Sequence, residues 1–116
     1  MSEKVAIKGL DLYVVLNGDV PTVKCAGRVV AGVNDRLYRE VVALIPNSKR
    51  VILDFTDVTH MDSMGLGTLV RLYVHAKSAG AVIELMNPGR SIKQLLGLTH
   101  MMQVFQMVGE NNIRMG

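Results

Sequence analysis

The pattern of hydrophobic positions changes period most sharply within residues 51–67. Residues 51–55 form an apolar run that only Asp54 interrupts, and such a run is typical of a strand buried on both faces. We therefore predict a parallel central strand here, followed by an acidic turn. After Met61 the apolar positions recur at helical spacing and predict an amphipathic helix that ends near Gly80.

The start of this predicted helix contains unusual residues. Asp62 or Ser63 supplies the short side-chain oxygen of an N-cap. Gly65 and Gly67 follow within the first turns, where each glycine costs about 1 kcal/mol relative to alanine. We expect them to mark a close approach of another backbone or of a partner.

The earlier part of the chain predicts a hairpin and a helix. Residues 11–16 and 22–29 are expected to be strands joined by Asn17-Gly18-Asp19, which is the preferred chemistry of a tight turn. A further extended segment is expected around residues 5–7. A helix should follow Gly32, with Asn34 as its cap and Pro46-Asn47 as its stop.

The later part alternates between the same two element types. A strand is expected over residues 81–86, then a short helix beginning at Asn87 or Ser91 and ending at Gly97, then a strand over 104–108. The order of elements predicts the α/β class. We expect a mixed β-sheet of about five strands, an antiparallel opening hairpin and then parallel β-α crossovers, packed with three to four helices.

Composition indicates one globular domain over residues 1–116, since 49% of the residues are hydrophobic and 20% are charged. Charged residues near the N-terminus and the lack of a bilayer-length apolar run argue against export and membrane insertion. The single cysteine, Cys25, is expected to be a small buried hydrophobe. These features predict a cytoplasmic protein.

The net charge of +3 raises nucleic-acid binding as a question. The basic residues are scattered among acidic ones, and aromatic residues make up only 4% of the chain. Neither a basic stripe nor a stacking platform is therefore expected. We predict no direct nucleic-acid partner.

Enzyme and cofactor chemistry is weakly supported. Ser63, His60 and Asp62 are too close in sequence for an ordinary triad, and Gly-x-Ser-x-Gly is absent. Asp57, His60 and Asp62 have no recognised metal-ligand spacing. Gly65-Leu66-Gly67 matches half of a dinucleotide loop, but Val70 occupies the third glycine position. No catalytic residue, metal or cofactor is predicted, and nucleotide binding is kept only as an alternative.

The central motif resembles a known family. The motif is Asp62-Ser63-Met64-Gly65-Leu66-Gly67, preceded by residues 51–55. The match continues through residues 80–85, 92–98 and Val104-Phe105, and reaches back to residues 27–29. Together these segments resemble the STAS-domain family, specifically the bacterial anti-sigma factor antagonists.

This resemblance implies a non-enzymatic regulator of transcription that is switched by phosphorylation. Ser63 matches the serine that an ATP-dependent anti-sigma factor serine kinase phosphorylates in such proteins. The unphosphorylated form binds that kinase and so releases a sigma factor, and a phosphoserine phosphatase resets the cycle. Phosphorylation would add roughly −1.5 to −2 charges at a helix start, whose dipole tolerates negative charge.

The predicted partner-binding surface surrounds this serine. It comprises Asp62, Ser63, Met64, Gly65, Leu66, Gly67, Asp57, His60 and Arg28. The alternatives are that Ser63 is only a helix cap, or that the domain is a protein-interaction module of another system, such as a stress-signalling scaffold or a lipid-transport subunit. We expect a monomer or a weak dimer.

Overall fold

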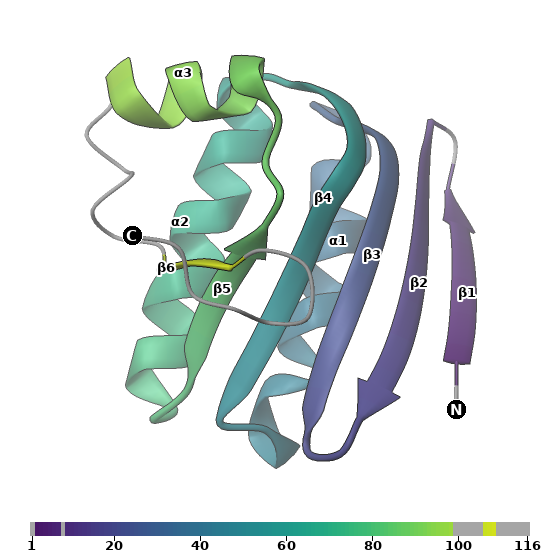
Figure 1. The fold of residues 1–116 in the computed structure, drawn as a ribbon, viewed down its shortest axis with the longest axis vertical. Helices are drawn as coiled ribbons and strands as arrows, with labels where there is room; N and C mark the ends of the chain where they lie inside the picture. The colour runs from purple at the N-terminus through teal and green to yellow at the C-terminus, as the bar shows by residue number, and fades with distance from the viewer. Residues whose placement is uncertain (1, 8, 99–105, 109–116) are drawn as a thin grey trace.

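The computed structural model describes residues 2–7, 9–98 and 106–108, which form a sheet and its covering helices (Figure 1). The strands are β1 (Ser2–Ile7), β2 (Leu10–Asn17), β3 (Val20–Val29), β4 (Arg50–Met61), β5 (Val82–Met86) and β6 (Gln106–Val108). The helices are α1 (Asn34–Val42), the short 3-10 helix η1 (Ile45–Asn47), α2 (Ser63–Ser78) and α3 (Arg90–Leu98). In the described residues the strand order in the sheet is the same as the order in the chain.

The sheet is mixed, as the order of elements predicted. The pairs β1–β2 and β2–β3 are antiparallel, whereas β3–β4, β4–β5 and β5–β6 are parallel. Asn17 pairs with Val20 across the predicted hairpin turn, and Gly18 adopts a φ of +64° that suits glycine. The extended segment expected around residues 5–7 is part of β1, which adds a strand to the predicted five.

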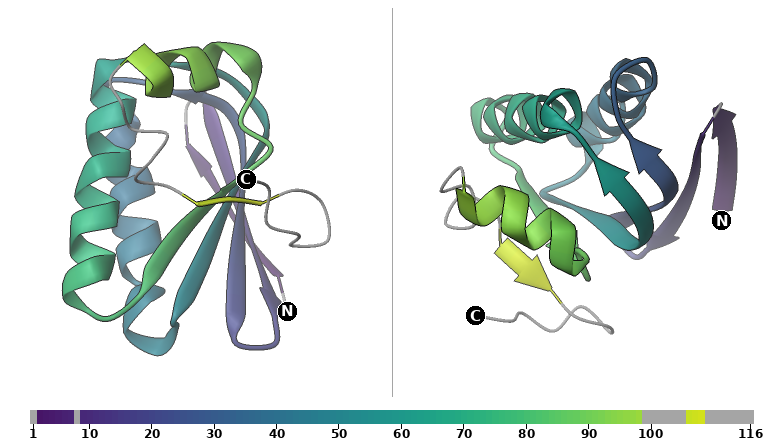
Figure 2. Two further views of the ribbon diagram at one scale, coloured as in Figure 1. Left: turned by 60° about the vertical axis from the view of Figure 1, so that its left-hand side comes forward. Right: turned by 90° about the horizontal axis from the view of Figure 1, so that it is seen from above.

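Helices α1 and α2 lie side by side on one face of the sheet (Figure 2). Helix α3 lies across the end of the sheet where β4 and β5 finish (Figure 1), and its Ile92 and Leu96 join the main core. Strand β4 is central, parallel to both neighbours. Its Val51, Leu53 and Phe55 are fully buried in the core beneath the helices. The prediction of a doubly buried parallel strand is confirmed.

The prediction of an acidic turn after Phe55 is wrong. Strand β4 continues to Met61, because β3 is long enough to pair with it as far as Val29. The two strands stay paired through shifts in register at Lys24/Ala26 and Gly27/Arg28, which absorb extra residues of β4 as bulges. Asp57 and His60 therefore lie on a strand and not in a loop.

Two predicted helix boundaries also need correction. Asn34 does not cap α1: Val33 occupies the cap position without a side-chain bond, and Asn34 is buried inside the first turn. Gly97 does not end α3, which continues to Leu98. A glycine near a helix end is only a statistical stop signal, and here the helical backbone continues through it.

The remaining predictions concern the cysteine, membrane spans and the last strand. Cys25 is buried as expected, and burial raises the pKa of its thiol well above the ordinary value. Among the described residues no helix is both long enough and apolar enough to cross a bilayer. Of the strand predicted over 104–108, Val104-Phe105 lie outside the described residues.

Candidate functional site

Ser63 is the first residue of α2 and follows the end of β4 after one residue, Asp62, at the edge where the parallel strands end. Its side chain is exposed, and within the described residues no hydrogen bond holds its hydroxyl. Met64 beside it is 54% exposed, although it is a large apolar side chain. The helix start thus presents a free hydroxyl next to an adaptable thioether, which suits a surface that another protein contacts.

Asp62 is the N-cap of α2, one of the two residues predicted for this position. Its Oδ1 accepts a 2.9 Å hydrogen bond from the backbone N–H of Gly65. Its Oδ2 accepts a 3.0 Å bond from the N–H of Ala31, which lies in the segment between β3 and α1. These two amides, Gly65 first, hold the pKa of the Asp62 carboxyl below its ordinary value.

Gly65 and Gly67 serve different purposes. A Cβ on Gly65 would lie 2.1 Å from the carbonyl oxygen of Val29, so only glycine lets α2 approach β3 this closely. The predicted close approach of a backbone is therefore confirmed at Gly65. A Cβ on Gly67 would meet nothing within 4 Å. The chain's own packing does not require Gly67, and a partner contact there stays a prediction.

A buried polar pair that the sequence did not indicate supports the same helix start. Asn34 donates a 3.2 Å hydrogen bond from Nδ2 to Oγ1 of Thr68, whose hydroxyl in turn donates 3.1 Å to the carbonyl of Met64. Asn34 and Thr68 are 6% and 1% exposed. The first turn of α1 is thereby bonded to the second turn of α2, beneath Ser63 and Met64.

The remaining predicted contact residues come from the paired strands. Arg28 and His60 are register partners on β3 and β4 and are both exposed. The His60 ring nitrogen Nδ1 lies 3.0 Å from Oγ1 of Thr59. Asp57 is exposed and pairs with Ala26, two pairs earlier along the same ladder. These residues thus lie on the last part of the β3–β4 pair, near the end of β4 from which α2 starts.

The six residues of the central motif are therefore not equivalent. Ser63 and Met64 are exposed, Asp62 and Gly67 are half-buried, and Gly65 is buried. Leu66 is partly buried and packs against the main core. Leu66 and Gly65 hold the helix in place, so the exposed part of the motif consists mainly of Ser63 and Met64, with Asp62 and Gly67 beside them.

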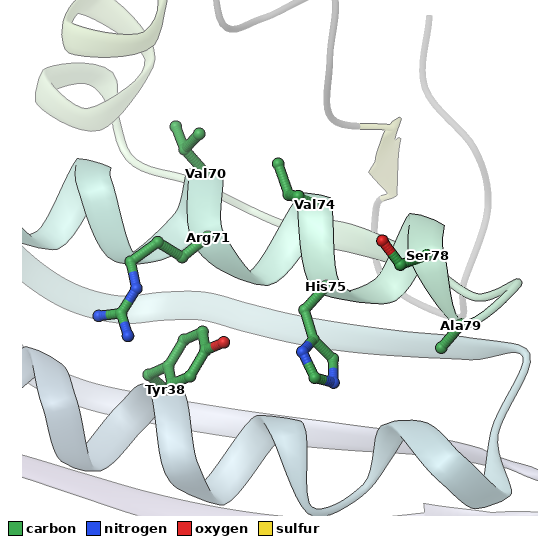
Figure 3. Close-up of a pocket in the computed structure, with 7 residues that line it drawn as sticks. All are labelled: Tyr38, Val70, Arg71, Val74, His75, Ser78 and Ala79. Atoms are coloured by element: carbon green, nitrogen blue, oxygen red, sulfur yellow. The ribbon is translucent and has the colours of Figure 1, made fainter.

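A shallow hollow lies along the later part of α2 (Figure 3). Its volume is about 530 Å³. Arg71 stacks over the Tyr38 ring of α1, with its guanidinium carbon 4.0 Å from the ring centre, and His75 contacts the same ring edge-on. Val70 and Val74 point to the other side of the helix. The hollow shares no lining residue with the motif that contains Ser63.

The carboxylate next to Ser63 is engaged with the backbone. Each oxygen of Asp62 accepts a hydrogen bond from a backbone amide. In the part of the chain that the structure describes, no group of three or more histidine, cysteine or acidic side chains could hold a metal ion. The arrangement can present a hydroxyl to another protein's active site.

Comparisons with known proteins agree with this fold. A family model described as the STAS domain matches residues 12–113. A STAS-domain containing protein of Pseudomonas aeruginosa (strain UCBPP-PA14) is 30% identical over 93 residues, which cover 78% of this chain and 90% of that protein.

Similar solved structures include anti-sigma factor antagonists. The antagonist SpoIIAA in its unphosphorylated form has a TM-score of 0.74 at 13% identity, covering 85% of this chain and 89% of that one. A sulfate transporter family protein from Wolinella succinogenes has a TM-score of 0.68 at 21% identity, covering 85% of this chain and 79% of that one. At these identities the likeness shows the fold alone. The family match over residues 12–113 establishes that the chain belongs to the STAS-domain family.

Proposed function

We propose that this chain is an anti-sigma factor antagonist, switched by phosphorylation of Ser63. In its unphosphorylated form it binds an anti-sigma factor serine kinase, and the sigma factor held by that kinase is released to start transcription. A phosphoserine phosphatase restores the binding form. The domain itself catalyses no reaction in this cycle.

The observation that carries the proposal is the presentation of Ser63. Its exposed hydroxyl stands at the first position of a helix whose cap, Asp62, is already occupied by backbone amides. Ser63 is therefore not needed as the cap, which is the alternative that the sequence left open. The similarity to an antagonist described in its unphosphorylated form supports the same assignment.

The reaction at this residue is a phosphoryl transfer on the kinase. The Ser63 Oγ forms a bond to the γ-phosphorus of ATP, the bond from that phosphorus to the β,γ-bridging oxygen breaks, and ADP leaves. The hydroxyl proton passes to a base of the kinase. The product carries roughly −1.5 to −2 charges at pH 7, next to the ionised carboxylate of Asp62.

The proposed docking surface uses those members of the predicted set that are exposed or half-buried. Met64 and Gly67 adjoin Ser63 on α2, and Arg28, Asp57 and His60 extend the surface along the ends of β3 and β4. An added phosphate would disrupt kinase binding. A kinase surface that accepts a neutral hydroxyl would have to remove water from the new charge and would also repel it. Ser63 and Met64 are the centre of this surface in the proposal.

The test is phosphorylation by a purified anti-sigma factor kinase of the same organism, with ATP and mass-spectrometric mapping of the product. We expect one phosphate, at Ser63, and none on Ser63→Ala. Ser78→Ala is the matched control, since Ser78 is an exposed serine at the other end of the same helix, and it should be phosphorylated like wild type. Phosphorylation of Ser63→Ala at the wild-type rate would contradict the proposal.

A second candidate is a STAS interaction module of another system, such as a stress-signalling scaffold or a lipid-transport subunit. The similarity to a sulfate transporter family protein favours it, because the same fold serves a transport family. This candidate predicts a stable complex whose affinity is the same with serine or phosphoserine at position 63. Affinity purification of the endogenous complex, with both forms as bait, distinguishes the two.

A further inference from the structure

Four contacts join residues 29–34 to Asp62 and the start of α2. The Val29 carbonyl lies against Gly65 and accepts a 3.4 Å hydrogen bond from the Asp62 N–H. Asn34 bonds to Thr68, and the Ala31 amide bonds to the Asp62 carboxylate. Only the last of these contacts involves an ionised group, and that group is directly adjacent to Ser63 in sequence.

Asp62 accepts one more hydrogen bond than a helix cap requires. One oxygen of a serine, threonine or asparagine side chain can satisfy an amide in the first helical turn, as Oδ1 of Asp62 does for Gly65. The second oxygen reaches the amide of Ala31, 31 residues earlier in the chain. A carboxylate at this position can hold both amides at once, because its two oxygens are both acceptors.

The segment held by this second bond is a surface turn. Ala31 and Gly32 are exposed, and Gly32 has a φ of +97°. The carbonyl of Val30 accepts bonds from Val33 and Asn34, both at 3.2 Å, which close the turn into α1. The bond to Asp62 is what connects the outer, Ala31 side of this turn to α2.

We propose that Asp62 is a positioning residue that couples the phosphorylation state of Ser63 to the turn at residues 30–32. This inference rests on the proposed function, because it takes Ser63 as the modified residue. A phosphate on Ser63 repels the adjacent carboxylate and competes with it for the first-turn amides. The bond to Ala31 is then weakened, and the turn is released from α2.

The experiment measures amide hydrogen exchange at Ala31 and Gly65 by NMR, in wild type, in Asp62→Ser and in protein carrying phosphoserine at position 63 by genetic encoding. In Asp62→Ser we expect Ala31 to exchange about tenfold faster, since an ionic hydrogen bond is lost. Gly65 should stay protected, because serine still caps the helix. Phosphoserine at position 63 should accelerate Ala31 by a similar factor.

Phosphoserine at position 78 is the matched control. Ser78 is exposed at the far end of α2, so a phosphate there should leave Ala31 unchanged. The coupling is overturned if Ala31 exchanges at the wild-type rate with phosphoserine at position 63, or if position 78 has the same effect as position 63. The positioning role is overturned if Ala31 stays protected in Asp62→Ser.

A second variant and a second measurement complete the experiment. If Asp62→Ser speeds exchange throughout the chain, Asp62→Asn replaces it, since asparagine is a good cap but has a single acceptor oxygen. Kinase affinity is measured on the same samples. Loss of kinase binding with an unchanged Ala31 contradicts only this coupling, whereas a responsive Ala31 in a protein that no anti-sigma factor kinase binds contradicts only the proposed function.

Discussion

The two ends of α2 are held to the rest of the molecule in different ways. At its start, two hydrogen bonds and one close backbone contact hold the helix to β3, to α1 and to the segment between them. The hydrogen bonds involve the Asp62 carboxylate and the Thr68 hydroxyl, and the backbone contact is at Gly65. Further along, Leu72 and Ala76 are buried in the apolar core. Polar side chains there, such as Arg71, meet α1 only at the surface.

The difference between the two ends of α2 shows where the position of the helix is fixed most narrowly. Apolar packing stabilises a helix but tolerates changes of similar volume. Hydrogen bonds and a backbone contact fix position and orientation much more narrowly. The end that carries Ser63 has these directional contacts, which agrees with the proposal that another protein's active site reaches Ser63 in one geometry.

The largest effect is expected at Gly65. Gly65→Ala places a Cβ 2.1 Å from the Val29 carbonyl oxygen, so α2 must move away from β3. We expect a loss of about 3 kcal/mol in the free energy of unfolding, measured by urea denaturation. Gly67→Ala is the matched control: its Cβ meets nothing within 4 Å, and better helix propensity should add about 1 kcal/mol. Equal effects of the two substitutions would contradict the account of this contact.

A smaller effect on stability is expected for the buried hydrogen bond between Asn34 and Thr68. Asn34→Ala leaves Thr68 without its long-range partner, and we expect a loss of about 1–2 kcal/mol. A double-mutant cycle with Thr68→Val measures the coupling, which should be about 1 kcal/mol for two residues in direct contact. Additive losses would show that the bond between α1 and α2 contributes nothing specific.

The contribution of Asp62 should depend on pH. Its pKa is lowered in the folded protein from the model-peptide value of 3.8, so its ionised form stabilises the fold. This stabilisation is complete above that value and is lost as the pH falls through the lower, folded pKa. The stability difference between wild type and Asp62→Asn should therefore be constant near neutral pH and shrink below about pH 4. A difference that grows on acidification would contradict the assigned bonds.

The smallest effect on stability is expected at the later end of α2. Arg71 is exposed, and it contacts Tyr38 and, at 3.5 Å, Asp35. Arg71→Ala should cost about 0.5–1 kcal/mol, because exposed cation–π contacts and ion pairs are weak. Kinase binding should not change. A loss of kinase binding in Arg71→Ala would instead place the docking surface at the hollow along α2.

Local patterns were enough to predict much of the fold. The apolar run at residues 51–55, the Asn17-Gly18-Asp19 turn and the cap at Asp62 are signals contained in a few neighbouring residues. The extension of β4 to Met61 was missed because it depends on pairing with β3 and on bulges in that pairing. Sequence periodicity carries no information about a partner strand 30 residues away.

The site shows the same division. Ser63 and its motif could be found from the sequence, but the different roles of Gly65 and Gly67 could not, because two glycines in one helix look alike without the backbone that faces them. Asn34 was taken for a helix cap, its commonest role near a helix start. Its bond to Thr68 joins residues 34 positions apart, and no local signal indicates such a pair.

The central claim is that Ser63 controls partner binding. The most direct measurement is the affinity of a purified anti-sigma factor kinase from the same organism for this chain with serine and with phosphoserine at position 63, by calorimetry. We expect binding of the serine form and an affinity at least about tenfold lower for the phosphoserine form, which corresponds to about 1.4 kcal/mol. Equal affinities for the two forms would contradict the account.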